Sequence, residues 1–148
     1  MCATLSSRAV TNDVRLITLD PGHFHAGLVQ KFMYPQVSPV VHVYAPAGPD
    51  LDQHLARIQS FNTRPDQPTH WEEKIYTSPD YLERMLKDRA GNVVVLAGNN
   101  ARKTDYINRS VSAGFNVLAD KPMAITPADF GLLRKAFTRA ASRKVLLY

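Results

Sequence analysis

The chain has 148 residues, 45% of them hydrophobic and 21% charged, which is the composition of an ordinary globular domain. A chain of this length forms one domain and buries about 70% of its unfolded surface. No apolar run approaches the ~20 residues that cross a bilayer, so we predict no transmembrane segment. The single cysteine, Cys2, excludes an intramolecular disulfide and a cysteine-based metal site.

The net charge of +5 raises the question of an anionic partner such as nucleic acid. The lysines and arginines are scattered, however, and several fall on the surfaces of predicted helices, where solvated charge is usual. We therefore predict no nucleic-acid partner.

Residues 1–13 are small and polar, and they contain neither apolar periodicity nor the apolar core of a secretory signal. We interpret them as a disordered lead-in to a domain that covers residues 14–148. Cys2 has two interpretations: it is a chance residue, or it marks the start of an exported lipoprotein whose signal has been removed. The compartment is left open, with the cytoplasm as the default.

Strands and helices alternate along the rest of the chain. The first predicted strand covers residues 14–19, the helix after it covers residues 24–34, and the second strand covers residues 40–44. Asp50 is expected to cap the next helix, whose apolar residues recur at helical spacing.

A polar loop is predicted over residues 62–74, and its length favours a functional role. The loop, which includes Trp71, has two interpretations: it covers an adenine ring, or it mediates contacts between chains. A brief edge strand at residues 75–76 follows. The next helix is predicted to have Ser78 as its cap, Pro79 in its first turn and Asp80 near the positive end of the helix dipole.

The second half of the chain repeats the alternation. The continuous apolar run at residues 93–97 predicts a central parallel strand, and a helix over residues 101–113 follows it. Another short buried strand begins at Asn116, and a helix that begins near Thr126 is expected to bury Phe130, Leu133 and Phe137. A sixth strand is predicted at residues 145–148. Six strands alternating with helices predict an α/β fold, a Rossmann-type doubly wound parallel sheet in three layers (α/β/α).

The turn after the first strand is the first candidate site. Dinucleotide-binding folds carry G-x-G-x-x-G here, because glycines let the backbone approach a pyrophosphate. Only the central glycine is present, as Gly22, with Asp20 and His25 at the outer positions. It is either a phosphate-binding turn or a plain strand-to-helix turn, and the flanking elements favour binding by Gly22, His23, Phe24 and His25.

The chain lacks two features that a site of this kind could carry. We predict no metal site, since no further histidine or carboxylate is placed to complete a ligand shell around His23 and His25. The acid that holds the adenosine ribose is missing after Tyr44, and no arginine adjoins that strand end. The choice between NAD and NADP is therefore unresolved.

Two further candidate sites follow the later strands. Gly98, Asn99 and Asn100 follow the central strand, where asparagines either bond a ribose or carboxamide or only make the turn. Asp120 and Lys121 end the next strand, which Pro122 stops, so the lysine faces the crevice where α/β sheets bind ligands.

These residues resemble the N-terminal domain of the glucose–fructose oxidoreductase / inositol dehydrogenase / rhizopine catabolism (Gfo/Idh/MocA) family. The run from Ala113 to Pro122, AGFNVLADKP, is similar to the family signature aG-x-x-V-l-x-E-K-P, with Asp120 in place of glutamate. The resemblance implies a nicotinamide dinucleotide as cofactor and a catalytic Lys121 beside the nicotinamide and the substrate hydroxyl. It also implies a cis peptide bond at Pro122 and a cofactor lying along Asn99 and Asn100.

The chain departs from the family pattern at Asp20 and His25, at the missing ribose acid, and at Lys103, where the family usually has a histidine. The altered phosphate loop resembles a divergent Bacteroidetes-type branch. In the family a second, C-terminal domain supplies the substrate pocket and a catalytic histidine. That domain is absent from these residues, so we expect this chain alone to be inactive.

The resulting hypothesis is the cofactor domain of an NAD(P)-dependent oxidoreductase that acts on a sugar, cyclitol or related polyol by hydride transfer. Its partners would be a nicotinamide dinucleotide and a small sugar-like substrate, with the oligomeric state left open. One alternative is a nonenzymatic Rossmann-type binding or sensor domain. The other is redox-assisted cleavage of a glycosidic bond, in which NAD is retained.

Overall fold

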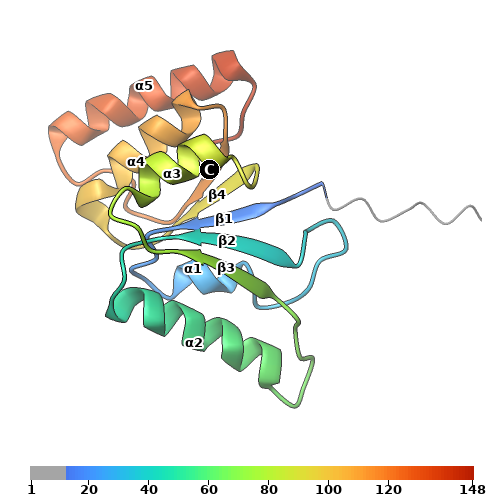
Figure 1. Ribbon diagram of the computed structural model, residues 1–148. Coiled ribbons are helices and arrows are strands. Elements are labelled where there is room, and N and C mark those ends of the chain that lie inside the picture. Colours follow the sequence, from blue (N-terminus) through green and yellow to red (C-terminus); the bar gives the residue numbers. More distant parts are fainter. Residues whose placement is uncertain (1–12) are drawn as a thin grey trace, which may run out of the picture.

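The computed structural model of the protein describes residues 13–148 (Figure 1). The disordered lead-in predicted for residues 1–13 therefore lies, apart from Asp13, outside the described residues, and so does Cys2. The elements in chain order are β1 (Leu16–Leu19), α1 (His25–Leu28), β2 (Val40–Tyr44), α2 (Pro49–Thr63), β3 (Glu72–Tyr76), α3 (Tyr81–Asp88), β4 (Val93–Leu96), α4 (Asn100–Ser112), β5 (Asn116–Ala119) and α5 (Pro127–Arg143).

The five strands form one parallel sheet in the order β3-β2-β1-β4-β5, which confirms the predicted Rossmann-type fold. The chain moves outward from β1 to β3 and then returns to the other side of β1, so the strand order reverses between β1 and β4. The predicted sixth strand is present only as a parallel bridge beside β5. There the Tyr148 amide donates to the Val117 carbonyl at 3.0 Å, and Val117 in turn donates to Leu146 at 2.8 Å.

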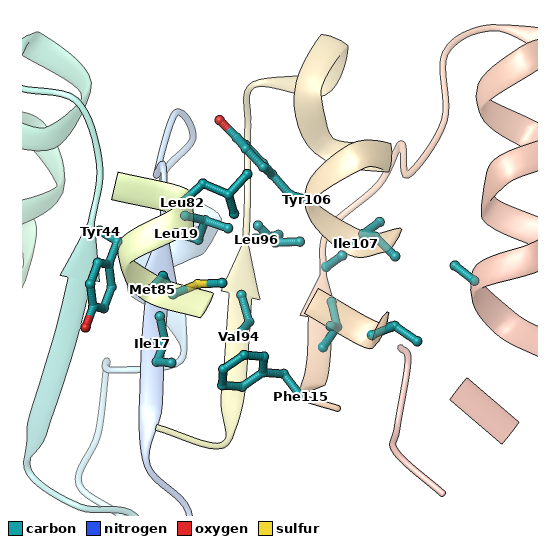
Figure 2. Packing of buried hydrophobic residues seen from close by; sticks show 14 of the residues in the cluster. Ile17, Leu19, Tyr44, Leu82, Met85, Val94, Leu96, Tyr106, Ile107 and Phe115 are labelled. Atoms are coloured by element: carbon teal, nitrogen blue, oxygen red, sulfur yellow. The ribbon is translucent and has the colours of Figure 1, made fainter. Parts of the chain in front are cut away.

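Helices cover both faces of the sheet, with α1 and α2 on one side and α3, α4 and α5 on the other (Figure 1). Alternate residues of each strand face the two layers. In β1, Ile17 and Leu19 join the larger core, whose members also include Met85 and Phe115 (Figure 2), whereas Leu16 packs in the core beneath α2. No helix of the described part of the chain is long and apolar enough to cross a membrane.

Helix α1 is much shorter than predicted. It covers four residues, and the backbone then continues through tighter turns, with Gln30 donating to Gly27 at 3.1 Å. The Gln30 carbonyl accepts a hydrogen bond from the indole of Trp71 at 2.6 Å. In a longer helix this carbonyl would instead accept from a backbone amide of the next turn. The prediction of a helix over residues 24–34 was wrong because it weighed local pattern alone.

Trp71 is buried, with 4% of its surface exposed, and it packs against Val41 and Ile58. It is therefore a core residue, so its own side chain is not available to either of the two roles considered for the loop. The loop before it is also shorter than predicted, since α2 continues to Thr63 and β3 begins at Glu72.

Helix α5 begins as expected, with a capping box in which Thr126 accepts from the Asp129 amide at 3.1 Å. Of the three residues expected to be buried, Phe130 and Phe137 are exposed and only Leu133 is buried. The buried face of α5 is instead completed by small alanines, which permit close packing on α4. The buried face of α5 therefore consists of Leu133, Ala136 and Ala140, and it lies on a different side of the helix from the two phenylalanines.

Candidate functional site

Three predicted segments meet where the strand order reverses. The Gly22 amide donates to the Ala97 carbonyl at the end of β4 at 2.9 Å, and the Asn99 side chain donates to the Asp20 carbonyl at 3.1 Å. The Asp120 amide donates to the Leu96 carbonyl at 2.9 Å. The ends of β1, β4 and β5 are therefore joined directly, at the edge of the sheet where doubly wound folds bind ligands.

The contact between the first two turns requires glycine on both sides. A Cβ atom on Gly98, whose φ is +88°, would lie 2.6 Å from the Gly22 Cα and from the His23 nitrogen. A Cβ atom on Gly22 would lie 2.9 Å from the amide nitrogen of the Asn99 side chain. Gly98 is thus needed for the close approach of the two backbones, and Gly22 leaves room for the Asn99 side chain, which turn propensity alone did not reveal.

Asp20 occupies the first glycine position of the turn in the left-handed region, at φ +47°. Its buried carboxylate accepts hydrogen bonds from Tyr106 at 2.5 Å and from Tyr81 at 3.3 Å, and Arg102 lies 3.9 Å away. Burial and the bond to Asp20 raise the pKa of Tyr106, so this phenol remains a donor. The acid that departs from the glycine pattern is therefore the centre of a buried hydrogen-bond network that fixes the turn.

Lys103 and Asp120 form the second departure from the family pattern. Lys103 is fully buried, and its ammonium group bonds both the Asp120 carboxylate and, at 3.2 Å, the Asp120 carbonyl. Burial alone would raise the pKa of Asp120, but the hydrogen bond and charge of Lys103 hold it below its usual value. Lys103 thereby fixes the residue that precedes Lys121.

His23 and His25 both face Asp120. Their Nδ1 atoms lie 3.5 and 3.3 Å from the same carboxylate oxygen, Asp120 Oδ2. The sequence had suggested that no carboxylate would stand near the two histidines. The structure corrects this, because β5 brings Asp120 next to a turn that lies some 95 residues earlier in the chain.

Two hollows flank the Gly22 turn. One is lined by Gly22, His23, Phe24, Asp50, His54 and Arg57 among others, and the second, at the end of β2, is lined by residues that include Ala45, Gly48, Asp50 and Arg102. The cap of α2 is Gly48, so the prediction that Asp50 caps it was wrong. An acid and an arginine do line the hollow at the end of β2. The sequence analysis treated Asp50 as a helix cap, and it missed Arg102 because this residue arrives from α4.

The remaining predicted residues lie around the same crevice mouth. Asn99, in the left-handed region, precedes α4, and Asn100 is its exposed first residue. Lys121 and Pro122 are exposed beyond β5, and the peptide bond between them is cis, as expected. Their exposure leaves the lysine ammonium accessible to a bound molecule.

Comparison with known proteins gives a family match over more than half of the chain. The family described as "Oxidoreductase family, NAD-binding Rossmann fold" (GFO_IDH_MocA) matches residues 49–147. A comparison with curated proteins gives no significant match.

Several solved structures share the fold. A proposed oxidoreductase from Parabacteroides merdae is 56% identical over 95% of this chain and 32% of its own, with a TM-score of 0.92. GenD2 from gentamicin A biosynthesis, solved with NAD, is 20% identical over 98% of this chain and 36% of its own, with a TM-score of 0.61. A proposed myo-inositol dehydrogenase from Sinorhizobium meliloti is 15% identical over 90% of this chain and 35% of its own, with a TM-score of 0.60. The chain thus spans about a third of the length of these structures.

Proposed function

The chain belongs to the Gfo/Idh/MocA oxidoreductase family and forms its NAD-binding Rossmann domain, and from this premise we propose that it serves an enzyme that oxidises or reduces a sugar, cyclitol or related polyol. The observation that carries the proposal is the junction of three strand ends at the point where the strand order reverses. It joins the Gly22 turn, the Gly98 turn and the Asp120–Lys121 segment.

The two hollows suggest how the cofactor would lie. The pyrophosphate would lie against the Gly22 turn, in the hollow that Arg57 also lines. The adenosine would enter the hollow at the end of β2, between Asp50 and Arg102. The nicotinamide would then reach toward Asp120 and Lys121, since these follow β5 on the opposite side of the crevice.

Lys121 would be the catalytic residue that this chain contributes. The nicotinamide ring supplies the hydride acceptor or donor when the cofactor is bound. The exposed ammonium of Lys121 would orient the substrate hydroxyl, and its charge would stabilise the alkoxide that develops as hydride leaves the carbinol carbon. The buried Lys103–Asp120 pair fixes the backbone immediately before it. We propose that the substrate pocket and the proton acceptor lie on a second domain, in keeping with the greater length of the related structures.

The substrate class is suggested by relatives of two kinds, the proposed myo-inositol dehydrogenase and the gentamicin-pathway protein GenD2. Both share the fold at low identity. A vicinal hydroxyl-rich substrate also fits a lysine whose role is to hold a hydroxyl oxygen.

Calorimetric titration of this chain with NAD⁺, NADH, NADP⁺ and NADPH tests the cofactor site. We expect saturable binding of one pair, and we expect Arg57→Ala to weaken it at least ~10-fold by removing a charge-assisted hydrogen bond. His70→Ala, on an exposed loop residue, is the matched control and should leave binding unchanged. Asp50→Ala and Arg102→Ala then separate the coenzymes: loss of NAD⁺ affinity in the first indicates a ribose contact, and loss of NADP⁺ affinity in the second indicates a phosphate contact.

Turnover has to be measured in a protein that also contains the proposed substrate domain. There Lys121→Ala is expected to lower kcat at least ~100-fold while the dissociation constant of the cofactor stays within a few-fold. Near-normal turnover in this variant would remove Lys121 from the mechanism. Cofactor binding without turnover on any polyol would favour a nonenzymatic binding domain.

A further inference from the structure

His23, His25 and Asp120 form a cluster at the crevice to which the proposed hydride transfer assigns no chemical role. One possible ligand atom from each residue lies within 4.8 Å of the other two, and no other such group of three or more is found in the described residues. Two of the residues come from the turn after β1 and the third from the end of β5. The cluster therefore exists only in the folded domain.

The distances within the cluster match the separation of ligand atoms around one metal ion, and one of them, from His25, is also a long hydrogen bond. The two histidine Nδ1 atoms lie 3.5 and 3.3 Å from Asp120 Oδ2, whereas N–H···O bonds usually measure ~2.7–3.2 Å. A tetrahedral ion bonded at ~2.0–2.1 Å holds its ligand atoms roughly 3.3–3.4 Å apart. Each imidazole nitrogen therefore lies about as far from Asp120 Oδ2 as two ligand atoms of one ion lie from each other.

Neighbouring residues hold the three side chains of the cluster in orientations that suit metal coordination. Lys103 holds Asp120 Oδ1, which leaves Oδ2 to the histidines and fixes the orientation of the carboxylate. The rings of His23 and His25 contact edge to face with centroids 4.3 Å apart, and Phe24 packs against both. Because Lys103 already offsets the charge of Asp120, selectivity would rest on the two imidazoles.

We propose that His23, His25 and Asp120 bind one divalent transition-metal ion, with Zn²⁺, Co²⁺ and Ni²⁺ preferred to Mg²⁺ and Ca²⁺. Imidazole nitrogens select the first group of ions, whereas Mg²⁺ and Ca²⁺ require sites built mainly of oxygen. The side chains of His23 and His25 are 43% and 33% exposed, so the remaining coordination positions open to the crevice. Water or an oxygen of a bound molecule would fill them. This site goes beyond the proposed function and does not depend on it.

The test is a calorimetric titration of the untagged, chelator-treated chain with Zn²⁺, carried out in a Cys2→Ser background so that the thiol cannot compete. We expect one ion per chain, and we expect His23→Ala and His25→Ala each to weaken binding at least ~10-fold. His70→Ala removes an exposed histidine outside the cluster and should leave binding unchanged. The visible spectrum of bound Co²⁺ should lose intensity or shift in the two cluster variants only.

The histidine variants decide the outcome, because Asp120→Asn would leave Lys103 buried without its carboxylate. Circular dichroism and urea unfolding establish that each variant is folded. The proposal is overturned if Zn²⁺ fails to saturate the chain, or if it binds equally well to His23→Ala and His25→Ala. Dinucleotide titration of the same samples is a separate measurement, so a loss of the cofactor role would be seen independently of the metal.

Discussion

Glu73 provides a quantitative test of how the turn after α1 is held. Gln30 is fully buried and donates to Glu73 Oε1 at 2.5 Å, while Glu73 Oε2 and Gln30 Oε1 have no hydrogen-bond partner within the described residues. Burial raises the pKa of Glu73 from 4.5 to about 7, despite the opposing hydrogen bond from Gln30. The folded protein therefore favours the neutral acid, and Glu73→Gln would supply a permanently neutral group of the same shape.

The sign of the pH effect follows from the raised pKa. The stabilising contribution of Glu73 is fully present below its unfolded value of 4.5 and is lost as pH rises through about 7. A shift of that size corresponds to about 3 kcal/mol. The unfolding free energy of Glu73→Gln should therefore equal that of the parent chain at a pH near 4.5. Above pH about 7 it should exceed the parent value by up to about 3 kcal/mol.

Urea unfolding at a series of pH values measures this difference, with the fluorescence of the only tryptophan, Trp71, as the probe. Trp71 donates to the Gln30 carbonyl, so its signal reports on the same region. Glu72→Gln, on the exposed neighbouring residue of β3, is the matched control and should show no comparable pH-dependent gain. A stability difference for Glu73→Gln that stays constant across this pH range would refute the reasoning.

Three other changes test the site and its supports. Gly98→Ala should destabilise the chain by at least ~2 kcal/mol in the urea assay and weaken dinucleotide binding, because its Cβ would overlap the turn after β1. Gly131→Ala, inside α5, should instead stabilise the chain by about 0.5–1 kcal/mol in the same assay, because no atom lies within 4 Å of the added Cβ. Lys103→Met should lower the unfolding free energy by about 3 kcal/mol by removing the buried ammonium group that offsets the charge of Asp120, which then keeps only its contacts with His23 and His25; combining it with Asp120→Asn should recover most of the loss. Burial, aided by Arg57, lowers the pKa of His54 from 6.5 to about 4, so its stabilising contribution is present above 6.5 and is lost as pH falls toward 4; an NMR titration of the imidazole checks this value directly.

The order of strands and helices could be predicted because it depends on short-range patterns. Continuous apolar runs such as residues 93–97 predicted buried parallel strands, and their alternation with helices indicated a single fold class, the doubly wound α/β sheet. Lys121, Gly22 and Asn99 could be predicted as candidate residues for the same reason, since each stands directly after a strand. The sequence pattern could not predict where a distant residue replaces a local hydrogen-bond partner. In the shortened α1, for example, the Gln30 carbonyl is bonded by Trp71.

By itself, then, the sequence determined the Rossmann-type parallel sheet and predicted the three strand ends that we propose as the cofactor site, because apolar periodicity and strand-terminating residues act over a few neighbours. Only the tertiary structure decided that Lys103 pairs with Asp120, that Arg102 reaches the end of β2, and that two histidines face one carboxylate. These groups lie far apart along the chain. They meet because parallel strands bring all their carboxyl ends to one edge of the sheet, where contacts depend on strand order and helix packing that no local pattern encodes.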